Sequence, residues 1–163
     1  MQLKWTAVAL AALTLVACGK KEEAAAPAAA PAPTAAAPAA APAGETLLVK
    51  IGHVAPTSGP IAHLGKDNEF GAKMAIEDLN AKGLKIGDKV AKFELVAEDD
   101  AGDPKQGTAV AQKLVDEKVN GVVGHLNSGT TIPASKLYSD AGIPQVSPSA
   151  TNPKYTRQGF KTT

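Results

Sequence analysis

The sequence predicts an α/β domain with a parallel sheet and helices on both of its faces. From residue 47 onward, short apolar segments alternate with longer segments whose apolar residues recur at helical spacing. Two of the helical segments are followed by a glycine, Gly83 and Gly142. Glycine readily adopts the left-handed conformation that commonly ends a helix. Strands that alternate with helices in this way form parallel sheets with right-handed crossovers.

The first strand and helix are expected over residues 47–82. Leu47–Val54 is apolar and is the expected strand, and the turn 55–60, rich in proline, serine and glycine, ends it. The helix that follows has apolar residues at positions i, i+3, i+4 and i+7, namely Ala72, Ala75, Ile76 and Leu79.

The second strand and helix follow the same pattern. Val90–Ala97 is the expected strand. Asp103, with Pro104 after it and Gln106 three residues on, has the pattern of a capping box with proline at the first helical position. The helix that opens there has one apolar side, formed by Val110, Ala111, Leu114 and Val115.

A third strand is predicted over Gly121–Leu126, where a short apolar run precedes a polar turn. The turn leads into a helix with Pro133 in its first turn. The apolar residues of that helix recur at the same spacing and are Ala134, Leu137, Tyr138 and Ala141. Residues 143–146 then begin a fourth strand.

Residues 1–17 are typical of a secretory signal peptide. Lys4 supplies a basic start, and Trp5–Ala17 is an apolar run of about 13 residues, too short to span a bilayer. Leu15–Gly19 resembles the bacterial lipobox, whose cysteine, here Cys18, is acylated and becomes the first residue of the mature protein. The alternative is an ordinary secretory signal that ends near a cysteine. We expect an exported protein, periplasmic or at the cell surface, with a lipid anchor at Cys18.

Residues 18–46 are expected to form a spacer between this anchor and the folded domain, residues 47–163. The stretch 24–43 is almost only alanine and proline, and its prolines break any helix and favour extended polyproline geometry. Such a spacer holds a domain clear of the membrane and leaves it free to reorient.

Two polar loops are the candidate site, because ligands of parallel sheets bind at the carboxyl ends of the strands. In the first loop, the free N–H groups of a helix start at Ser128 and Gly129, with the hydroxyls of Ser128, Thr130 and Thr131, could hold an anion such as a carboxylate. The alternative is that one of these residues only caps the helix.

The second loop is Ser147–Asn152, which is rich in hydroxyls and stiffened by prolines. It follows the fourth strand and is therefore expected at the same edge of the sheet as Ser128. With Ser149 and Thr151 as its binding residues, the two loops together would form a pocket for a small zwitterion.

Composition and spacing weigh against other functions. A net charge of +1 gives no reason to expect nucleic acid, and a single cysteine excludes an internal disulfide. The acidic residues 98–103 could suggest a Mg²⁺ site, but Asp103 as a helix cap beside a solvated acidic turn is the preferred interpretation. The histidines lack metal-ligand spacing, so no metal or cofactor is predicted.

A hydrolase is a further alternative, with Ser128 as nucleophile and His125 as base. The segment around the serine lacks the framing glycines of a Gly-x-Ser-x-Gly nucleophile elbow. A histidine three places before the serine on a strand would also tend to point away from it. No catalytic residue and no enzyme activity are predicted.

Spaced segments in one order resemble a known family. They are Thr57-Ser58-Gly59-Pro60, Asn80-Ala81-Lys82-Gly83, Asp99-Asp100-Ala101-Gly102-Asp103-Pro104, Gly124-His125-Leu126 with Ser128, Gly142-Ile143-Pro144 and Ser147-Pro148-Ser149-Ala150-Thr151. Together they are similar to the extracytoplasmic leucine/isoleucine/valine-binding proteins of ABC transporters, which are type I periplasmic binding proteins. The resemblance runs from about residue 47 to the end.

The resemblance implies a two-lobed protein that closes on an amino acid and delivers it to an ABC permease and ATPase. This chain would hold most of the first lobe, as an incomplete N-terminal fragment. The positions that hold the ligand's carboxylate and ammonium would be Ser128, Ser149 and Thr151. Leu64 stands where an aromatic residue often packs against the ligand, which leaves side-chain specificity open. A sensory lobe of the same fold is the alternative to a transport function.

This chain also departs from the family at two positions. Gly102 and Asn127 stand where some members carry a pair of cysteines. Both cysteines of that disulfide are therefore absent here.

Overall fold

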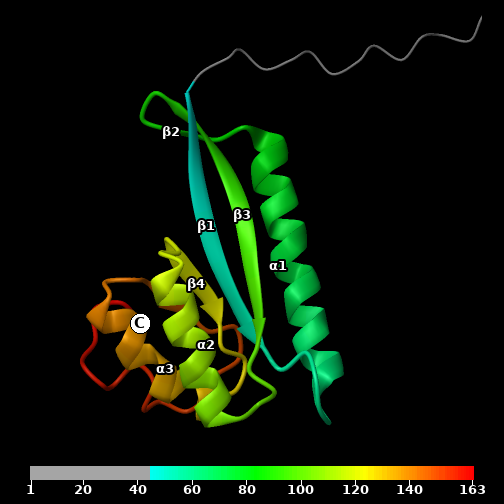
Figure 1. Cartoon of the computed structure of the whole chain (residues 1–163), viewed down its shortest axis with the longest axis vertical. Coiled ribbons are helices and arrows are strands. Elements are labelled where there is room, and N and C mark those ends of the chain that lie inside the picture. The colour runs from blue at the N-terminus through cyan, green and yellow to red at the C-terminus, as the bar shows by residue number, and fades with distance from the viewer. Residues whose placement is uncertain (1–44) are drawn as a thin grey trace, which may run out of the picture. The chain divides into compact units, whose positions relative to one another are not determined.

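A computed structural model describes residues 45–163, which form a five-stranded sheet flanked by helices (Figure 1). The strands in chain order are β1 Thr46–Ala55, β2 Lys85–Ile86, β3 Lys89–Asp99, β4 Gly121–Gly124 and β5 Gln145–Val146. The helices are α1 Ala62–Lys82, α2 Pro104–Asp116 and α3 Ser128–Asp140. The strand order across the sheet is β2-β3-β1-β4-β5, and β1 pairs in parallel with both β3 and β4.

The predicted α/β class is confirmed, with one addition. The short strand β2 pairs antiparallel with the start of β3, Lys85 opposite Val90 and Ile86 opposite Lys89. Gly87, with φ of 60°, lies in the tight turn between the two strands. Residues 85 and 86 were not predicted as a strand, because two residues are too few for a periodic signal.

The main core lies between the sheet and the pair α2 and α3. Val54 on β1 and Val122 on β4 face this layer and pack with Leu114 of α2 and Tyr138 of α3. All four side chains are buried, and they belong to a cluster that also contains Val110, Ala111, Val119, Ala134 and Ile143. The apolar sides predicted for these helices are the sides that form this core.

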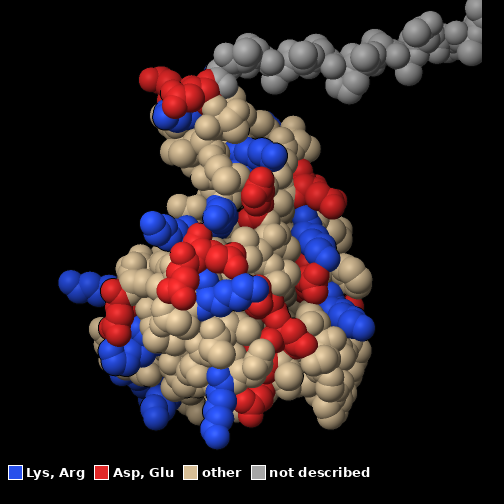
Figure 2. Space-filling model, viewed as in Figure 1, with Lys and Arg blue, Asp and Glu red and all other residues tan. Residues whose placement is uncertain are grey.

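The other face of the sheet is only partly covered. In Figure 1, α1 runs along β1 and β3 on the side opposite α2 and α3. It leaves β4 and β5 open, so Val123 and Val146 are 37% and 67% exposed. Figure 2 shows acidic and basic side chains alternating down the solvent side of α1. Helices on both faces are therefore confirmed, with an apolar strip left uncovered on one of them.

The carboxyl end of α1 is fastened to β3 by a side chain. The Asn80 carboxamide donates to the Phe93 carbonyl (2.9 Å) and accepts from the Phe93 N–H (2.8 Å). Both backbone groups of one residue on β3 are thus satisfied by a single side chain.

The start of α3 differs from the prediction. Pro133 lies inside the helix and not in its first turn, because α3 already begins at Ser128. The Asn127 carbonyl accepts the N–H groups of Thr130 (3.1 Å) and Thr131 (2.8 Å), which starts the helix before the proline is reached.

The start of α2 confirms one prediction and corrects another. Asp103 caps the helix by accepting the N–H groups of Lys105 and Gln106. The acidic turn before it is not simply solvated, because Asp100 is fully buried.

The predicted signal peptide, Cys18 and nearly all of the predicted spacer lie outside the described residues. Within residues 45–163, none of the helices combines the length and apolar character needed to cross a bilayer.

Candidate ligand-binding site

The candidate site lies at the edge of the sheet where the parallel strands end. After β4 ends at Gly124, His125–Asn127 lead into α3, which begins at Ser128. After β5, residues 147–152 form the second loop. β4 and β5 are neighbours in the sheet and run parallel, so their two loops leave it side by side.

Hydrogen bonds join these two loops directly. The Ser147 hydroxyl donates to the His125 carbonyl (2.7 Å), and the Ser149 hydroxyl donates to the Leu126 carbonyl (2.8 Å). The Asn152 N–H donates to Ser128 Oγ (3.2 Å). The structure thus brings together the loops that carry Ser128 and Ser149.

The start of α3 leaves backbone donors for an anion. Asn127 is the N-cap, but its side chain makes no capping hydrogen bond. The N–H groups of Ser128 and Gly129 belong to the first turn, where no carbonyl within the helix can accept them. Gly129 is exposed, with open space where a side chain would stand. The helix N-terminus therefore presents partial positive charge to this edge of the sheet.

Thr130 and Thr131 are buried, and their hydroxyls do not face an anion site as predicted. The hydroxyls of Thr130 and Thr131 both donate to the Asn127 carbonyl (3.0 and 2.8 Å), and both residues are fully buried. The prediction that these hydroxyls face an anion is wrong, because they serve the backbone of the turn instead.

The two serines differ in what they can still offer. Ser128 Oγ already accepts a hydrogen bond, so its own proton remains available for a carboxylate. Ser149 has used its proton on the Leu126 carbonyl, so its oxygen can only accept, as it would from an ammonium. Thr151 is exposed in the same loop. Leu64 lies on another element, in the first turn of α1, and is 44% exposed.

Behind the loops lies a buried polar chain. His125 Nδ1 donates to Asp100 Oδ2 at 2.9 Å, and His125 Nε2 lies 3.1 Å from the Tyr138 hydroxyl. All three side chains are fully buried. Sequence reasoning placed Tyr138 in the core and considered His125 as a base, but gave no sign that Asp100 joins them, since the residues are distant in the chain.

The hydrogen-bonded set Asp100, His125 and Tyr138 contains a charged carboxylate in the protein interior. Burial by itself raises the pKa of Asp100, but the hydrogen bonds with His125 and from the Gly102 N–H outweigh it and hold that pKa below its usual value. Burial raises the pKa of the Tyr138 hydroxyl, and the negative charge of Asp100 raises it further. Asp100 is therefore ionised and Tyr138 neutral at physiological pH.

This geometry separates His125 from Ser128. Both ring nitrogens of His125 face Asp100 and Tyr138, and within the described residues no hydrogen bond joins the histidine to the serine. The neighbouring acids each have a separate backbone partner: Asp99 accepts the Thr57 N–H (2.9 Å), and Asp103 caps α2. Within residues 45–163 there is no group of three or more His, Asp or Glu side chains placed to hold a metal ion.

The fold and its loop edge define a class of protein: the chain has the architecture of one α/β lobe, with two polar loops at the carboxyl ends of parallel strands, where proteins of this architecture hold their ligands. A family model described as "Periplasmic binding protein" matches residues 48–162. The chain belongs to this family.

Similar proteins include curated and solved members of the family. The leucine-specific-binding protein of Salmonella typhimurium is 49% identical over 114 residues, which cover 69% of this chain and 30% of that protein. The structure of a branched-chain amino acid transporter substrate-binding protein from Streptococcus pneumoniae, in complex with isoleucine, matches with a TM-score of 0.62 and 35% identity, over 68% of this chain and 31% of that one.

A third similar structure holds a different solute. It is a solute-binding protein of an ABC transporter from Rhodopseudomonas palustris in complex with 3,4-dihydroxybenzoic acid, with a TM-score of 0.59 and 27% identity, over 68% of this chain and 29% of that one. The chain thus spans less than a third of the length of the relatives it matches.

Proposed function

We propose that this chain contributes the carboxylate-binding part of an extracytoplasmic receptor, which binds an amino acid without changing it chemically and delivers it to an ABC permease and ATPase. The observation that carries the proposal is the meeting of two hydroxyl-bearing loops beside the uncapped start of α3. Ser128 donates its hydroxyl proton to the ligand's carboxylate, which also accepts the N–H of Gly129. Ser149 and Thr151 accept from the ammonium.

The choice of ligand rests on the relatives. Isoleucine and 3,4-dihydroxybenzoic acid, the ligands of two similar structures, share a carboxylic acid group and little else. This supports a lobe that recognises the carboxylate, with other contacts, Leu64 among them, selecting the rest of the solute. A branched-chain amino acid is the preferred ligand, because the leucine-specific relative is 49% identical over the matched residues.

Replacement of Ser128 by alanine tests this proposal. The variant loses a hydrogen bond to a charged group, worth about 1.5–3 kcal/mol, so leucine affinity is expected to fall by roughly tenfold to a hundredfold. Isothermal titration calorimetry on the gene product measures it, with leucine, isoleucine, valine and leucinamide as ligands. Leucinamide, which lacks the carboxylate, should bind the original protein weakly and be little affected by the substitution.

Ser139→Ala is the matched control, since Ser139 lies near the other end of the same helix. It should leave leucine affinity unchanged. Equal binding of leucine and leucinamide, or no loss in Ser128→Ala, would contradict a carboxylate site at Ser128.

The anchor is a second part of the proposal. Acylation of Cys18 would hold the protein at a membrane through the alanine- and proline-rich spacer, near its permease. Cys18→Ser is expected to move the protein from the membrane fraction to the soluble fraction of cells. Retention of the variant in the membrane fraction would exclude this anchor.

A further inference from the structure

Two successive carbonyl groups, those of His125 and Leu126, hold hydroxyls of both site loops. The His125 carbonyl accepts the hydroxyl of Ser147 (2.7 Å) and that of Thr131 (2.9 Å). The Leu126 carbonyl accepts the hydroxyl of Ser149 (2.8 Å). The position of the backbone at residues 125 and 126 therefore decides which way the Ser149 hydroxyl points.

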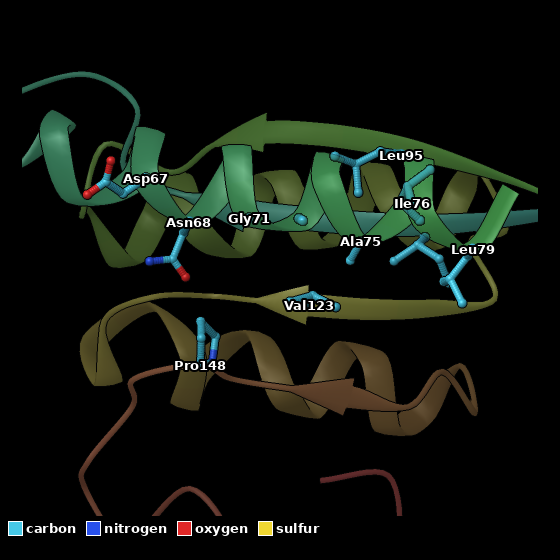
Figure 3. Close-up of a pocket in the computed structure, with 11 residues that line it drawn as sticks. Asp67, Asn68, Gly71, Ala75, Ile76, Leu79, Leu95, Val123 and Pro148 are labelled. Atoms are coloured by element: carbon cyan, nitrogen blue, oxygen red, sulfur yellow. The ribbon is translucent and has the colours of Figure 1, made fainter. Parts of the chain in front are cut away.

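An apolar groove adjoins the second loop but does not orient its hydroxyls. In Figure 3, Pro148 of that loop and Val123 of β4 line one groove on the α1 side of the sheet. Burial of apolar surface can hold a loop close to a strand, but it is non-directional, because it depends on the area removed from water. The direction of the Ser149 hydroxyl therefore depends on its hydrogen bond, and so on whatever fixes the backbone that accepts it.

The buried ring of His125 fixes this backbone. Nδ1 must donate to Asp100 (2.9 Å), because an ionised carboxylate can only accept, and Nε2 then accepts the hydroxyl of Tyr138 (3.1 Å). Asp100 is itself held by the N–H of Gly102 (3.0 Å), and Tyr138 belongs to the core cluster on α3. The ring is thus tied to the loop after β3 and to α3. All of this is buried by the described residues alone.

We propose that His125, held by Asp100, is a positioning residue of the ligand site. It is fully buried and cannot contact a ligand itself. Its ring places the Leu126 carbonyl, which accepts the Ser149 proton and leaves the Ser149 oxygen as an acceptor for the ligand's ammonium group. A serine released from that carbonyl could donate as readily as accept, so it would distinguish less well between ligands with and without an ammonium group.

The inference rests on the proposed function, because it takes Ser149 as the acceptor for the ammonium group. The test compares leucine with 4-methylpentanoate, which has the same carboxylate and side chain but no ammonium group. Isothermal titration calorimetry on the gene product gives the ratio of the two affinities. The original protein should prefer leucine by roughly tenfold or more, as expected for a hydrogen bond to a charged group.

Two substitutions of His125 separate the Asp100 bond from the loss of the ring. In His125→Asn, the side-chain N–H stands near the place of Nδ1 and can still donate to Asp100, so most of the preference for leucine should remain. In His125→Gln, the amide reaches toward Tyr138 instead and leaves Asp100 without its donor. This variant should reduce the preference by at least about fivefold.

Tyr138→Phe keeps the test decisive if the histidine variants do not fold. It removes one oxygen with almost no change of volume, and it leaves Nε2 without a partner. The preference should fall by about twofold to threefold, less than in His125→Gln. Asn80→Ala is the control for lost stability, because it removes two hydrogen bonds between α1 and β3, away from both loops. It should leave the ratio unchanged, since unfolding lowers the number of binding sites for both ligands equally.

The outcomes distinguish this inference from the proposed function. An original protein that binds no leucine, or binds both ligands equally, would contradict the proposed function and the inference with it. An original protein that prefers leucine, with the same ratio in His125→Gln and Tyr138→Phe, would overturn the positioning role alone. So would equal losses in His125→Asn and His125→Gln, because the Asp100 bond would then make no difference.

Discussion

Replacement of Gly124 by alanine is expected to destabilise the fold strongly. Gly124 ends β4 with φ of 136°, a conformation that L side chains rarely adopt. A Cβ at this position would overlap the carbonyl oxygen of Val54 on the neighbouring strand. Both positions belong to the sheet, so neither can move without breaking the pairing of β1 with β4. A loss of about 3 kcal/mol or more in the free energy of unfolding is expected.

Urea denaturation followed by circular dichroism measures this loss, and Gly142→Ala is the control. Gly142 also has positive φ, 72°, but nothing lies within 4 Å of an added Cβ. Its substitution should cost only about 1 kcal/mol, the backbone strain alone. Similar losses in the two variants would show that the close approach of Gly124 to Val54 carries no special cost.

His125→Phe is expected to destabilise the fold by about 3–5 kcal/mol, because it leaves the buried Asp100 carboxylate without its partner. Asp100→Leu alone should also destabilise the fold, since it removes the carboxylate that accepts the hydrogen bond of the buried His125 ring. The double variant replaces the pair with apolar groups and should lose less than the sum of the two single variants. Additive losses would show that Asp100 and His125 do not act as a pair.

The same pair predicts a loss of stability in acid. The pKa of Asp100 is lowered in the folded state, from an ordinary value of 3.8. Its contribution is therefore fully present above that ordinary value and is lost as the pH falls through the lower, folded-state pKa. Urea denaturation from pH 5 down to pH 2, a range that spans the ordinary value and extends below it, should show a shallower acid loss in Asp100→Asn than in the original chain. An unchanged pH profile would mean that Asp100 is not the group that titrates.

The sequence predicts the parts of this fold that repeat. Strands 47–54 and 90–97, and the apolar sides of α2 and α3, carry enough periodic residues to identify the elements and the faces they bury. The two loops at the site follow from the same reasoning, because parallel strands end at one edge. The capping role of Asp103 is a local rule and is likewise confirmed.

What the sequence leaves out depends on contacts between distant residues. Asp100 looks like part of a polar turn, and only the arrival of His125 from β4 makes it a buried charge. Thr130 and Thr131 look like anion ligands, and only the tight turn at Asn127 directs their hydroxyls to its carbonyl. Ser149 is predicted from the sequence only as a ligand-binding residue, and the nearby Leu126 carbonyl, which accepts its proton, leaves the Ser149 oxygen as an acceptor.

The Asn80 carboxamide limits strand pairing between one molecule and another. Beyond the two residues of β2, the outer side of β3 is an edge that could recruit a strand from another chain. At Phe93 both backbone groups that such a strand would need are occupied by Asn80. Continuous growth of the sheet from molecule to molecule is blocked at Phe93, so this edge resists fibre-like stacking of one molecule on the next.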